Sequence, residues 1–128
     1  GAVLALLGEK GVDYACNNQP VGYPHGLDCE VFTRDALIQA DREATDLYDR
    51  EHVTPWLRHA PHVTRRNLAG PGGSHVSWRW TVDYPEDLAF FQKIADAIGD
   101  NVQDSTAVTQ YLAAHPRLHD VNRSRRQR

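Results

Sequence analysis

The sequence has 128 residues, 41% of them hydrophobic and 24% charged, which is ordinary for a soluble globular domain or part of one. The formal net charge is −3, but residues 123–128 contain four arginines and no acid, so residues 1–122 carry −7. An acidic body argues against a nucleic-acid surface, and no apolar run reaches the about 18 residues that a membrane span needs. Because the chain lacks Met and starts inside a helical pattern, we expect it to be part of a longer polypeptide.

Helix and strand signals alternate along the chain, which indicates an α/β fold. The predicted helices cover residues 2–8, 34–43, a stretch after Thr45 or Asp46, 85–98 and 105–114. The predicted strands cover residues 12–17, 27–32, 62–69 and 76–82. Thr33 is a good N-cap for the second helix, and Pro55 should divide the third into two short pieces. The core side of these pieces should contain Leu47, Val53, Trp56 and Leu57.

In the strand predicted over residues 27–32, Asp28, Glu30 and Phe32 share one face. Two acids on a face indicate a side that is open to solvent, whereas an aromatic residue beside them indicates a polar cleft, and both interpretations stay open. Cys16 and Cys29 lie inside predicted strands and outside a CxxC pattern. Buried free thiols in a reducing cytoplasm are therefore favoured over a disulfide.

The most informative stretch, residues 78–88, predicts a strand, an acidic corner and a helix. Asp83 ends the strand, Pro85 suits the first helical position, and Glu86 and Asp87 place negative charge in the first turn. Ligands of α/β sheets gather beyond the carboxyl ends of strands, so Asp83 is the best functional candidate. The alternative is that Asp83 caps the helix. The charge of Asp87 is expected to serve mainly the helix dipole.

Motifs of other enzyme classes are missing: no Walker loop, dinucleotide fingerprint, nucleophile elbow or zincin motif occurs. His115 and His119 have helical spacing, but Pro116 breaks the helix that would bring them together, so we expect no metal at this pair. Residues 49–52 are dense in functional groups, and taken alone they are typical of a solvated helical turn.

Four blocks together resemble one family: YPHGLDCEVF (residues 23–32), REAT (42–45), YDREHVTP (48–55) and RWTVDYPEDL (79–88). In order and spacing they resemble the carboxyl-terminal half of the cytidylyltransferases. The resemblance is strongest to the branch named for a spore-coat polysaccharide biosynthesis protein (SpsF-like), and it extends to the CMP-sugar acid synthetases. It covers nearly the whole chain.

The resemblance implies a Rossmann-like α/β fold of the nucleotide-diphospho-sugar transferase (GT-A-like) type, with a mixed sheet flanked by helices. It also implies Mg²⁺-dependent nucleotidyl transfer from CTP to a sugar or sugar acid for surface polysaccharide synthesis. Asp83 matches the second metal-binding aspartate of the family, and a carboxylate oxygen is a hard ligand that suits Mg²⁺. By the same resemblance, the sugar side of the cleft would include Gly26, Asp28, Glu30, Arg50, Glu51 and His52.

Relatives begin with a strand and a loop rich in Arg, Gly and Ser, with a Lys, which holds the triphosphate, and a later segment supplies the first metal aspartate. Neither feature occurs in these 128 residues, so we expect no CTP turnover by this chain alone. The resemblance predicts that residues 1–122 are the carboxyl-terminal half of such a domain, and that residues 123–128 form a disordered basic tail. A cytoplasmic homo-oligomer, or a partner amino-terminal half, is expected. The alternatives are a non-catalytic sugar-binding or dimerisation module and an unrelated small metal-dependent enzyme.

Overall fold

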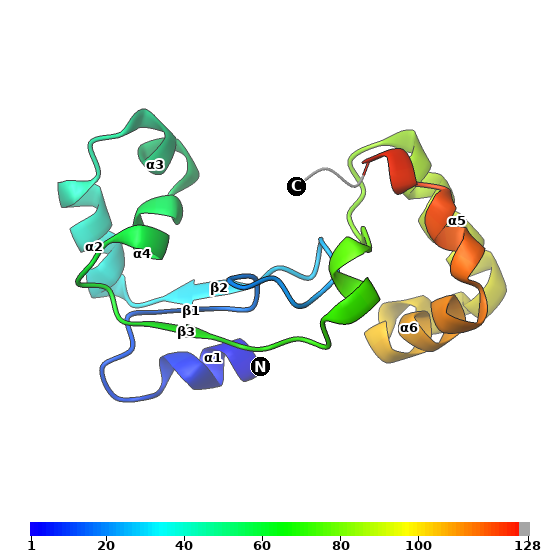
Figure 1. The fold of residues 1–128 in the computed structure, drawn as a ribbon, viewed down its shortest axis with the longest axis horizontal. Helices are drawn as coiled ribbons and strands as arrows, with labels where there is room; N and C mark the ends of the chain where they lie inside the picture. The colour runs from blue at the N-terminus through cyan, green and yellow to red at the C-terminus, as the bar shows by residue number, and fades with distance from the viewer. Residues whose placement is uncertain (126–128) are drawn as a thin grey trace. The chain divides into compact units, whose positions relative to one another are not determined.

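A computed structural model describes residues 1–125, which form two compact units. Unit 1 comprises Gly1–Tyr23 and Asp28–Gly73, and unit 2 comprises Pro24–Leu27 and the chain from Ser74 onward (Figure 1). None of the helices in the described part of the chain is long and apolar enough to cross a membrane. Of the predicted basic tail, Arg123–Arg125 form a 3₁₀ turn, η4, and residues 126–128 lie outside the described residues.

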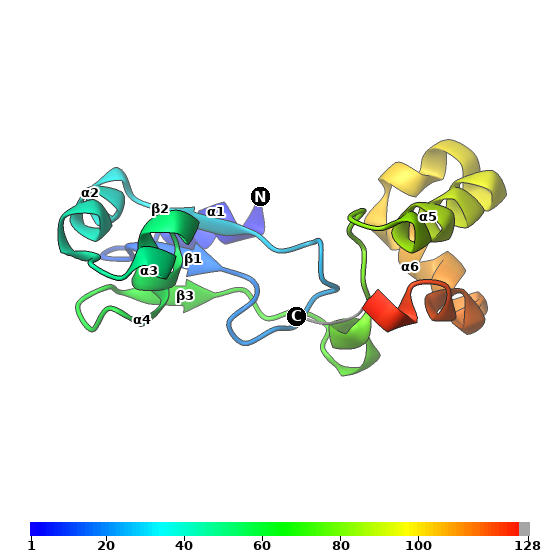
Figure 2. The same cartoon turned by 90° about the horizontal axis from the view of Figure 1, so that it is seen from above.

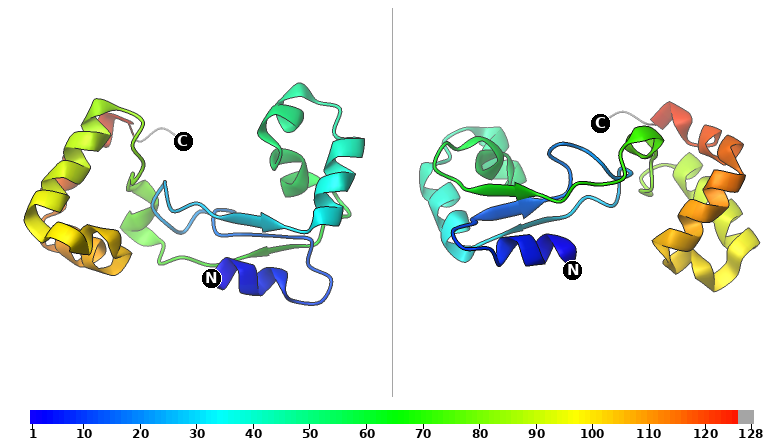
Figure 3. Two further views of the ribbon diagram at one scale, coloured as in Figure 1. Left: turned by 180° about the vertical axis from the view of Figure 1, so that it is seen from behind. Right: turned by 60° about the horizontal axis from the view of Figure 1, so that its bottom comes forward.

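Unit 1 is a small mixed sheet with helices on both sides. The central strand β1 (Tyr14–Cys16) runs antiparallel to β2 (Glu30–Phe32) and parallel to β3 (Arg65–Asn67), as Figure 2 shows. Helix α1 (Ala2–Leu7) lies on one side of the sheet (Figures 1 and 3). The other side carries α2 (Arg34–Glu43), α3 (Leu47–His52) and α4 (Pro55–His59).

Side chains alternate between the two faces of β1, and this alternation determines which of them enter the core of unit 1. Tyr14 and Cys16 point to the side of α2 and α4, where Phe32 of β2 also packs. The buried side chains that surround them are Ala36, Ala40, Ala44, Trp56, Leu57, Ala60 and Val63. Burial, with a further contribution from Cys16, raises the pKa of Tyr14 to about 12. The hydroxyl group of Tyr14 is therefore neutral at neutral pH, because burial disfavours its charged form.

Two predictions about the helices of unit 1 are confirmed: the N-cap of α2 and the division of the helical segment at Pro55. Thr33 Oγ1 accepts the N–H of Ala36 at 3.1 Å, and α2 covers the predicted residues. Asp46, rather than Thr45, caps α3, and Pro55 opens α4. The predicted division around Pro55 is therefore correct.

Two predictions about burial in unit 1 are wrong. Leu47 and Val53, which were expected in the core, are exposed because the six-residue helix α3 is held by polar contacts of Asp49 and Arg50 instead. Both cysteines are free, but Cys29, which immediately precedes β2, is exposed rather than buried.

Unit 2 is helical. After a 3₁₀ helix, η1 (Gly73–Ser77), it contains α5 (Pro85–Ile98), the 3₁₀ helix η2 (Gly99–Gln103), α6 (Ser105–Ala114) and the 3₁₀ helix η3 (Pro116–Asp120). Its core consists of Phe90 and Ile94 of α5 with Val108 and Leu112 of α6. The helices predicted from Pro85 and over residues 105–114 are confirmed, and Asp104 caps the second by accepting from Thr106.

The strand predicted over residues 76–82 is wrong. This segment makes an isolated parallel bridge, in which His25 donates its N–H to Trp78 O at 2.9 Å and accepts from the N–H of Trp80 at 2.6 Å. Its aromatic residues are half-buried by ring stacking rather than by neighbouring strands. The ring centroid of Trp78 lies 4.4 Å from that of His119. The aromatic residues of this segment are thus held by ring stacking and by the isolated bridge to His25.

Gly26 allows this bridge to form. Its φ is +107°, and a Cβ at this position would overlap the carbonyl group of Trp80. A glycine is required here both by the backbone conformation and by the close approach of Trp80.

We predict that Gly26→Ala destabilises unit 2 by about 2 kcal/mol or more, because a positive φ and a backbone clash act together. Gly99→Ala is the matched control in the same unit: its φ is +57°, but a Cβ there meets nothing within 4 Å. The control should lose less than Gly26→Ala, because it has the cost of the positive φ without a backbone clash. Denaturant unfolding followed by tryptophan fluorescence measures both losses. Equal losses would show that the contact with Trp80 has no effect.

Candidate functional site

Arg79 and Asp87 form a buried ion pair at the start of α5. The guanidinium Nε donates to Asp87 Oδ1 at 2.8 Å, and Nη2 donates to Oδ2 at 2.9 Å. The exposed fraction is 4% for Arg79 and 0% for Asp87. This two-point contact matches the planar fork of the guanidinium to the two carboxylate oxygens, which is the strongest form of such a pair.

The carboxylate of Asp87 also caps α5. Its Oδ2 accepts the backbone N–H of Asp83 at 3.2 Å and of Tyr84 at 3.1 Å, and its Oδ1 accepts from Asn122 Nδ2 at 3.0 Å. Burial by itself would raise the pKa of Asp87, but these donors, Arg79 above all, outweigh it and lower the pKa to about 2. The hydrogen bond to Asp87 likewise raises the pKa of Arg79. Asp87 is therefore a buried anion, and the expectation that it serves mainly the helix dipole is wrong.

Asp83 has a different environment. It lies neither at the end of a strand nor at the N-cap, because Tyr84 is the N-cap of α5. Its side chain is 57% exposed, and its Oδ2 accepts from Arg79 Nη2 at 2.6 Å and from Thr81 Oγ1 at 3.2 Å. Both of these contacts involve the same oxygen. The carboxylate is thus oriented by a buried cation and remains open to solvent.

An exposed carboxylate of this kind fits the role of one oxygen ligand for Mg²⁺. Asp87 offers no second ligand, because both of its oxygens already accept hydrogen bonds. Among residues 1–125, no group of three or more His, Cys, Asp or Glu side chains could hold a metal ion. At this corner, therefore, the described residues contain no cluster of three such side chains around Asp83.

Of the residues assigned to the sugar side, Gly26 belongs to unit 2 and the other five to unit 1. Asp28 is exposed in the segment before β2. Glu30 is only 15% exposed and pairs with Arg58 of α4. The interpretation of its strand face as open to solvent is therefore wrong for Glu30, because α4 covers that face.

Arg50, Glu51 and His52 lie together on α3. Arg50 Nη1 donates to the carbonyl oxygens of Asp41 at 2.8 Å and Ala44 at 3.2 Å, and Nη2 donates to Asp41 Oδ1 at 2.9 Å. Arg50 therefore ties α3 to the end of α2. Glu51 and His52 are exposed, and the ring of His52 lies 4.4 Å from that of Tyr48 between centroids.

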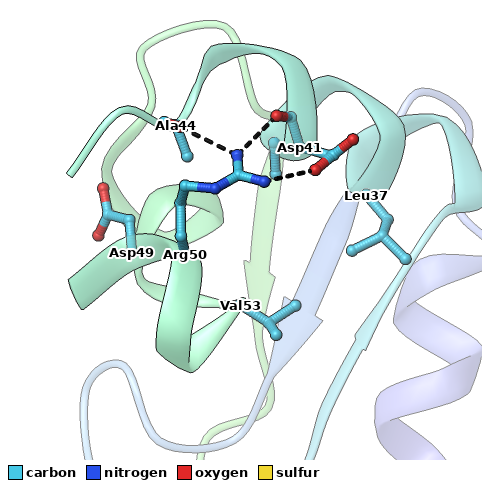
Figure 4. Close-up of a pocket in the computed structure, with 7 residues that line it drawn as sticks. Leu37, Asp41, Ala44, Asp49, Arg50 and Val53 are labelled. Atoms are coloured by element: carbon cyan, nitrogen blue, oxygen red, sulfur yellow. Dashed lines mark hydrogen bonds and ion pairs between the residues drawn. The ribbon is translucent and has the colours of Figure 1, made fainter. Parts of the chain in front are cut away.

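A small pocket of about 120 Å³ lies beside Arg50, between α2 and α3 (Figure 4). It is lined by Leu37, Ala40, Asp41, Ala44, Asp49, Arg50 and Val53. Ligand pockets usually measure about 300–1,000 Å³, so this one is too small for a sugar nucleotide. Val53 at its edge has a φ of +66° in a tight turn where Thr54 donates to His52 O at 2.7 Å. A β-branched residue in this conformation is strained.

The sequence analysis missed the roles of two residues. Arg79 carried a signal, because it is a charged residue inside an otherwise uncharged aromatic stretch and precedes Asp83 by four positions and Asp87 by eight. Asn122 carried no signal. It lies 35 positions after Asp87, and only the folding of unit 2 brings the two side chains together.

No protein-family model matches the chain. Over 108 residues it is 31% identical to the uncharacterized protein MJ1063 of Methanocaldococcus jannaschii, covering 80% of this chain and 43% of that protein. Its fold is similar to that of a cytidylyltransferase from Leptospira borgpetersenii serovar Hardjo-bovis, with a TM-score of 0.74 and 18% identity. That match covers 91% of this chain and 50% of the other. The chain therefore spans about half the length of each protein that it matches, and its α/β fold is of the kind found in a cytidylyltransferase.

We predict that Asp87→Asn lowers the stability of unit 2 by about 3–5 kcal/mol at neutral pH, because it leaves the buried charge of Arg79 without its main partner. Asp83→Asn is the matched control on the same guanidinium. It should cost less than about 1 kcal/mol, because Asp83 is solvent-exposed. Denaturant unfolding of the two variants measures the difference.

The pH dependence of the folding stability provides a second test of the Arg79–Asp87 ion pair. The pKa of Asp87 is about 2 in the folded chain, whereas an unfolded aspartate has a pKa of about 3.9. The charged carboxylate therefore stabilises the fold fully above about pH 4, and this contribution is lost as the pH falls towards about 2. The stability gap between wild type and Asp87→Asn should narrow over that interval. A gap that stays constant with pH would contradict the assignment.

Proposed function

We propose that this chain is the carboxyl-terminal part of a nucleotidyltransferase that transfers a cytidylyl group from CTP to a sugar or sugar acid. The observation that carries the proposal is the similarity of its fold to a cytidylyltransferase over 91% of its length. The sequence blocks at residues 23–32, 48–55 and 79–88 resemble the same class. The proposal includes a Rossmann-like sugar-nucleotide transferase fold in the complete protein, a cytoplasmic location and a role in surface polysaccharide synthesis.

In the proposed reaction a sugar hydroxyl oxygen forms a bond to the α-phosphorus of CTP, and the bond from that phosphorus to the bridging oxygen breaks. Pyrophosphate leaves, and the hydroxyl proton passes to solvent. Transfers of this kind depend mainly on positioning and on stabilisation of charge. Mg²⁺, when bound, supplies neutralisation of phosphate charge. Asp83 would contribute one oriented carboxylate oxygen, held in place by Arg79.

The contacts in unit 1 suggest different roles for the residues proposed for the sugar side. Glu51 and His52 present exposed side chains on α3, so we assign direct contact with the sugar to them, and Asp28, also exposed, can join them. Arg50 and Glu30 are bound to Asp41 and Arg58 within the unit. Their proposed role is to hold α3 and α4 in position.

We predict that the full-length gene product releases pyrophosphate from CTP with Mg²⁺ and a sugar or sugar acid, in an assay over a panel of such acceptors. Asp83→Asn should lower the rate by about 10²-fold or more while the melting temperature stays near wild type, because a charge is removed and the shape is kept. Asp96→Asn is the control, since Asp96 is an exposed carboxylate on α5. The 128-residue chain alone should stay at background.

Two results would contradict this function. One is a full-length product that releases no pyrophosphate with any acceptor. The other is an Asp83→Asn variant that is as active as Asp96→Asn. If the inactive product still binds sugars or dimerises, the non-catalytic module becomes the better interpretation.

We also propose that the protein forms homo-oligomers. On α3, Leu47 is 83% exposed and Tyr48 is 61% exposed, so adjacent apolar side chains face solvent. Sedimentation of the full-length product should show a dimer at micromolar concentration, and Leu47→Glu should shift it towards monomer. Val82→Glu, at an exposed apolar residue of unit 2, is the control. A wild-type monomer at all concentrations would contradict the proposal.

A further inference from the structure

A series of contacts connects the Asp83 carboxylate to Asn122 through Arg79 and Asp87. Asp83 Oδ2 accepts from Arg79 Nη2 at 2.6 Å, and the same nitrogen donates to Asp87 Oδ2 at 2.9 Å. One guanidinium nitrogen is thus shared between an exposed and a buried carboxylate. The position of Asp87 therefore determines where Arg79 can hold Asp83.

Asn122 fixes both members of the buried pair. Its side chain is 1% exposed, and its Nδ2 donates to the backbone oxygen of Arg79 at 3.1 Å and to Asp87 Oδ1 at 3.0 Å. The amide therefore holds the main chain of the cation and the side chain of the anion at once. Because it comes from the turn after η3, it also ties the end of unit 2 to the start of α5.

The oxygen atom of the Asn122 amide, Oδ1, is buried and accepts no hydrogen bond from the described residues. A buried acceptor without a partner is unfavourable, and an apolar residue would avoid that cost. The presence of an amide at this position is therefore explained by the two bonds that its NH₂ group donates.

We propose that Asn122 is a positioning residue for Asp83, acting through Asp87 and Arg79; the inference rests on the proposed function for what Asp83 binds. Without the Asn122 amide, Asp87 Oδ1 loses one of its two donors, and the main chain at Arg79 loses an anchor. The guanidinium then gains freedom to turn between the two carboxylates. Asp83 stays exposed and is oriented less firmly, because its contact with Thr81 Oγ1 is then the one that does not depend on Arg79.

The first experiment measures this geometry in the full-length gene product without any substrate or metal. Arg79 Nη2 is held by two carboxylates, so rotation of the guanidinium should be slow and its Nη–H signals in the NMR spectrum should be separate. In Asn122→Ala these signals should merge. They should be unchanged in Asn101→Ala, which alters an exposed asparagine of the same unit. If Asn122→Ala does not fold, Asn122→Ser, which keeps one donor, replaces it. Separate signals in the Asn122 variant would overturn the proposal.

The second experiment separates positioning from stability. Ile94→Val removes one methylene from the core of unit 2 and should lower the melting temperature modestly without touching the ion pair. Under conditions where both variants are folded, Asn122→Ala should raise the Mg²⁺ concentration for half-maximal pyrophosphate release by roughly tenfold or more, the usual effect of losing a ligand's support. Ile94→Val should leave it unchanged. An equal effect in the two variants would make Asn122 merely structural and would overturn the proposal.

The two experiments also distinguish the two failures. If wild type shows no Mg²⁺-dependent release, the proposed function fails, and the NMR signals of Arg79 alone decide whether Asn122 orients Asp83. If wild type is active and the signals do not merge in the variant, the proposed function stands and the positioning role is refuted.

Discussion

The fold of unit 2 depends on the buried ion pair between Arg79 and Asp87. Removing two charges from water is costly. Such a pair stabilises a fold only when its geometry is good and when further hydrogen bonds satisfy the remaining donors and acceptors. Both conditions hold here. Arg79 makes a two-point contact, and the carboxylate also accepts from two backbone N–H groups and from Asn122. The pair thereby joins the aromatic segment, the first turn of α5 and the turn after η3, and it adds polar contacts to the packing of Trp80, Leu118 and Val121 against the core.

The two acids on this guanidinium have separate roles because their exposure differs. Asp87 is fully buried and satisfied, so its charge is available to no ligand. Asp83 is more than half exposed, and one of its oxygens takes both of its contacts. A carboxylate on a flexible loop would lose conformational freedom on binding a cation, whereas one oriented in advance by a buried cation loses less. Asp87 thus offsets the cost of burying Arg79, and the buried guanidinium in turn orients the exposed carboxylate of Asp83.

The sequence predicted correctly those features that are determined by neighbouring residues in the chain. The helix from Pro85, the cap at Thr33 and the division at Pro55 each depend on residues within one turn, and all three are present. The prediction failed where tertiary contacts decide. The aromatic residues around Trp78 suggested a strand, but only His25 pairs with them in the described chain, and ring stacking buries them instead. Leu47 looked like a core residue because its pattern was helical, but polar contacts hold α3. Asn122 could not be found, since its partners lie more than 30 positions away.

The internal ion pairs also show how many polar residues of the sequence blocks contribute to the fold. Glu30 and Arg50 of the blocks pair with Arg58 and Asp41 outside them, and Arg79 pairs with Asp87 inside one block. Gly26 is required by the backbone of Trp80. Many polar residues of the blocks are therefore determinants of folding, and a chain that contains them must adopt the local structures that they stabilise whether or not it binds a ligand. At the start of α5 the carboxylate of Asp83 differs from these residues, because it remains exposed while the buried pair orients it.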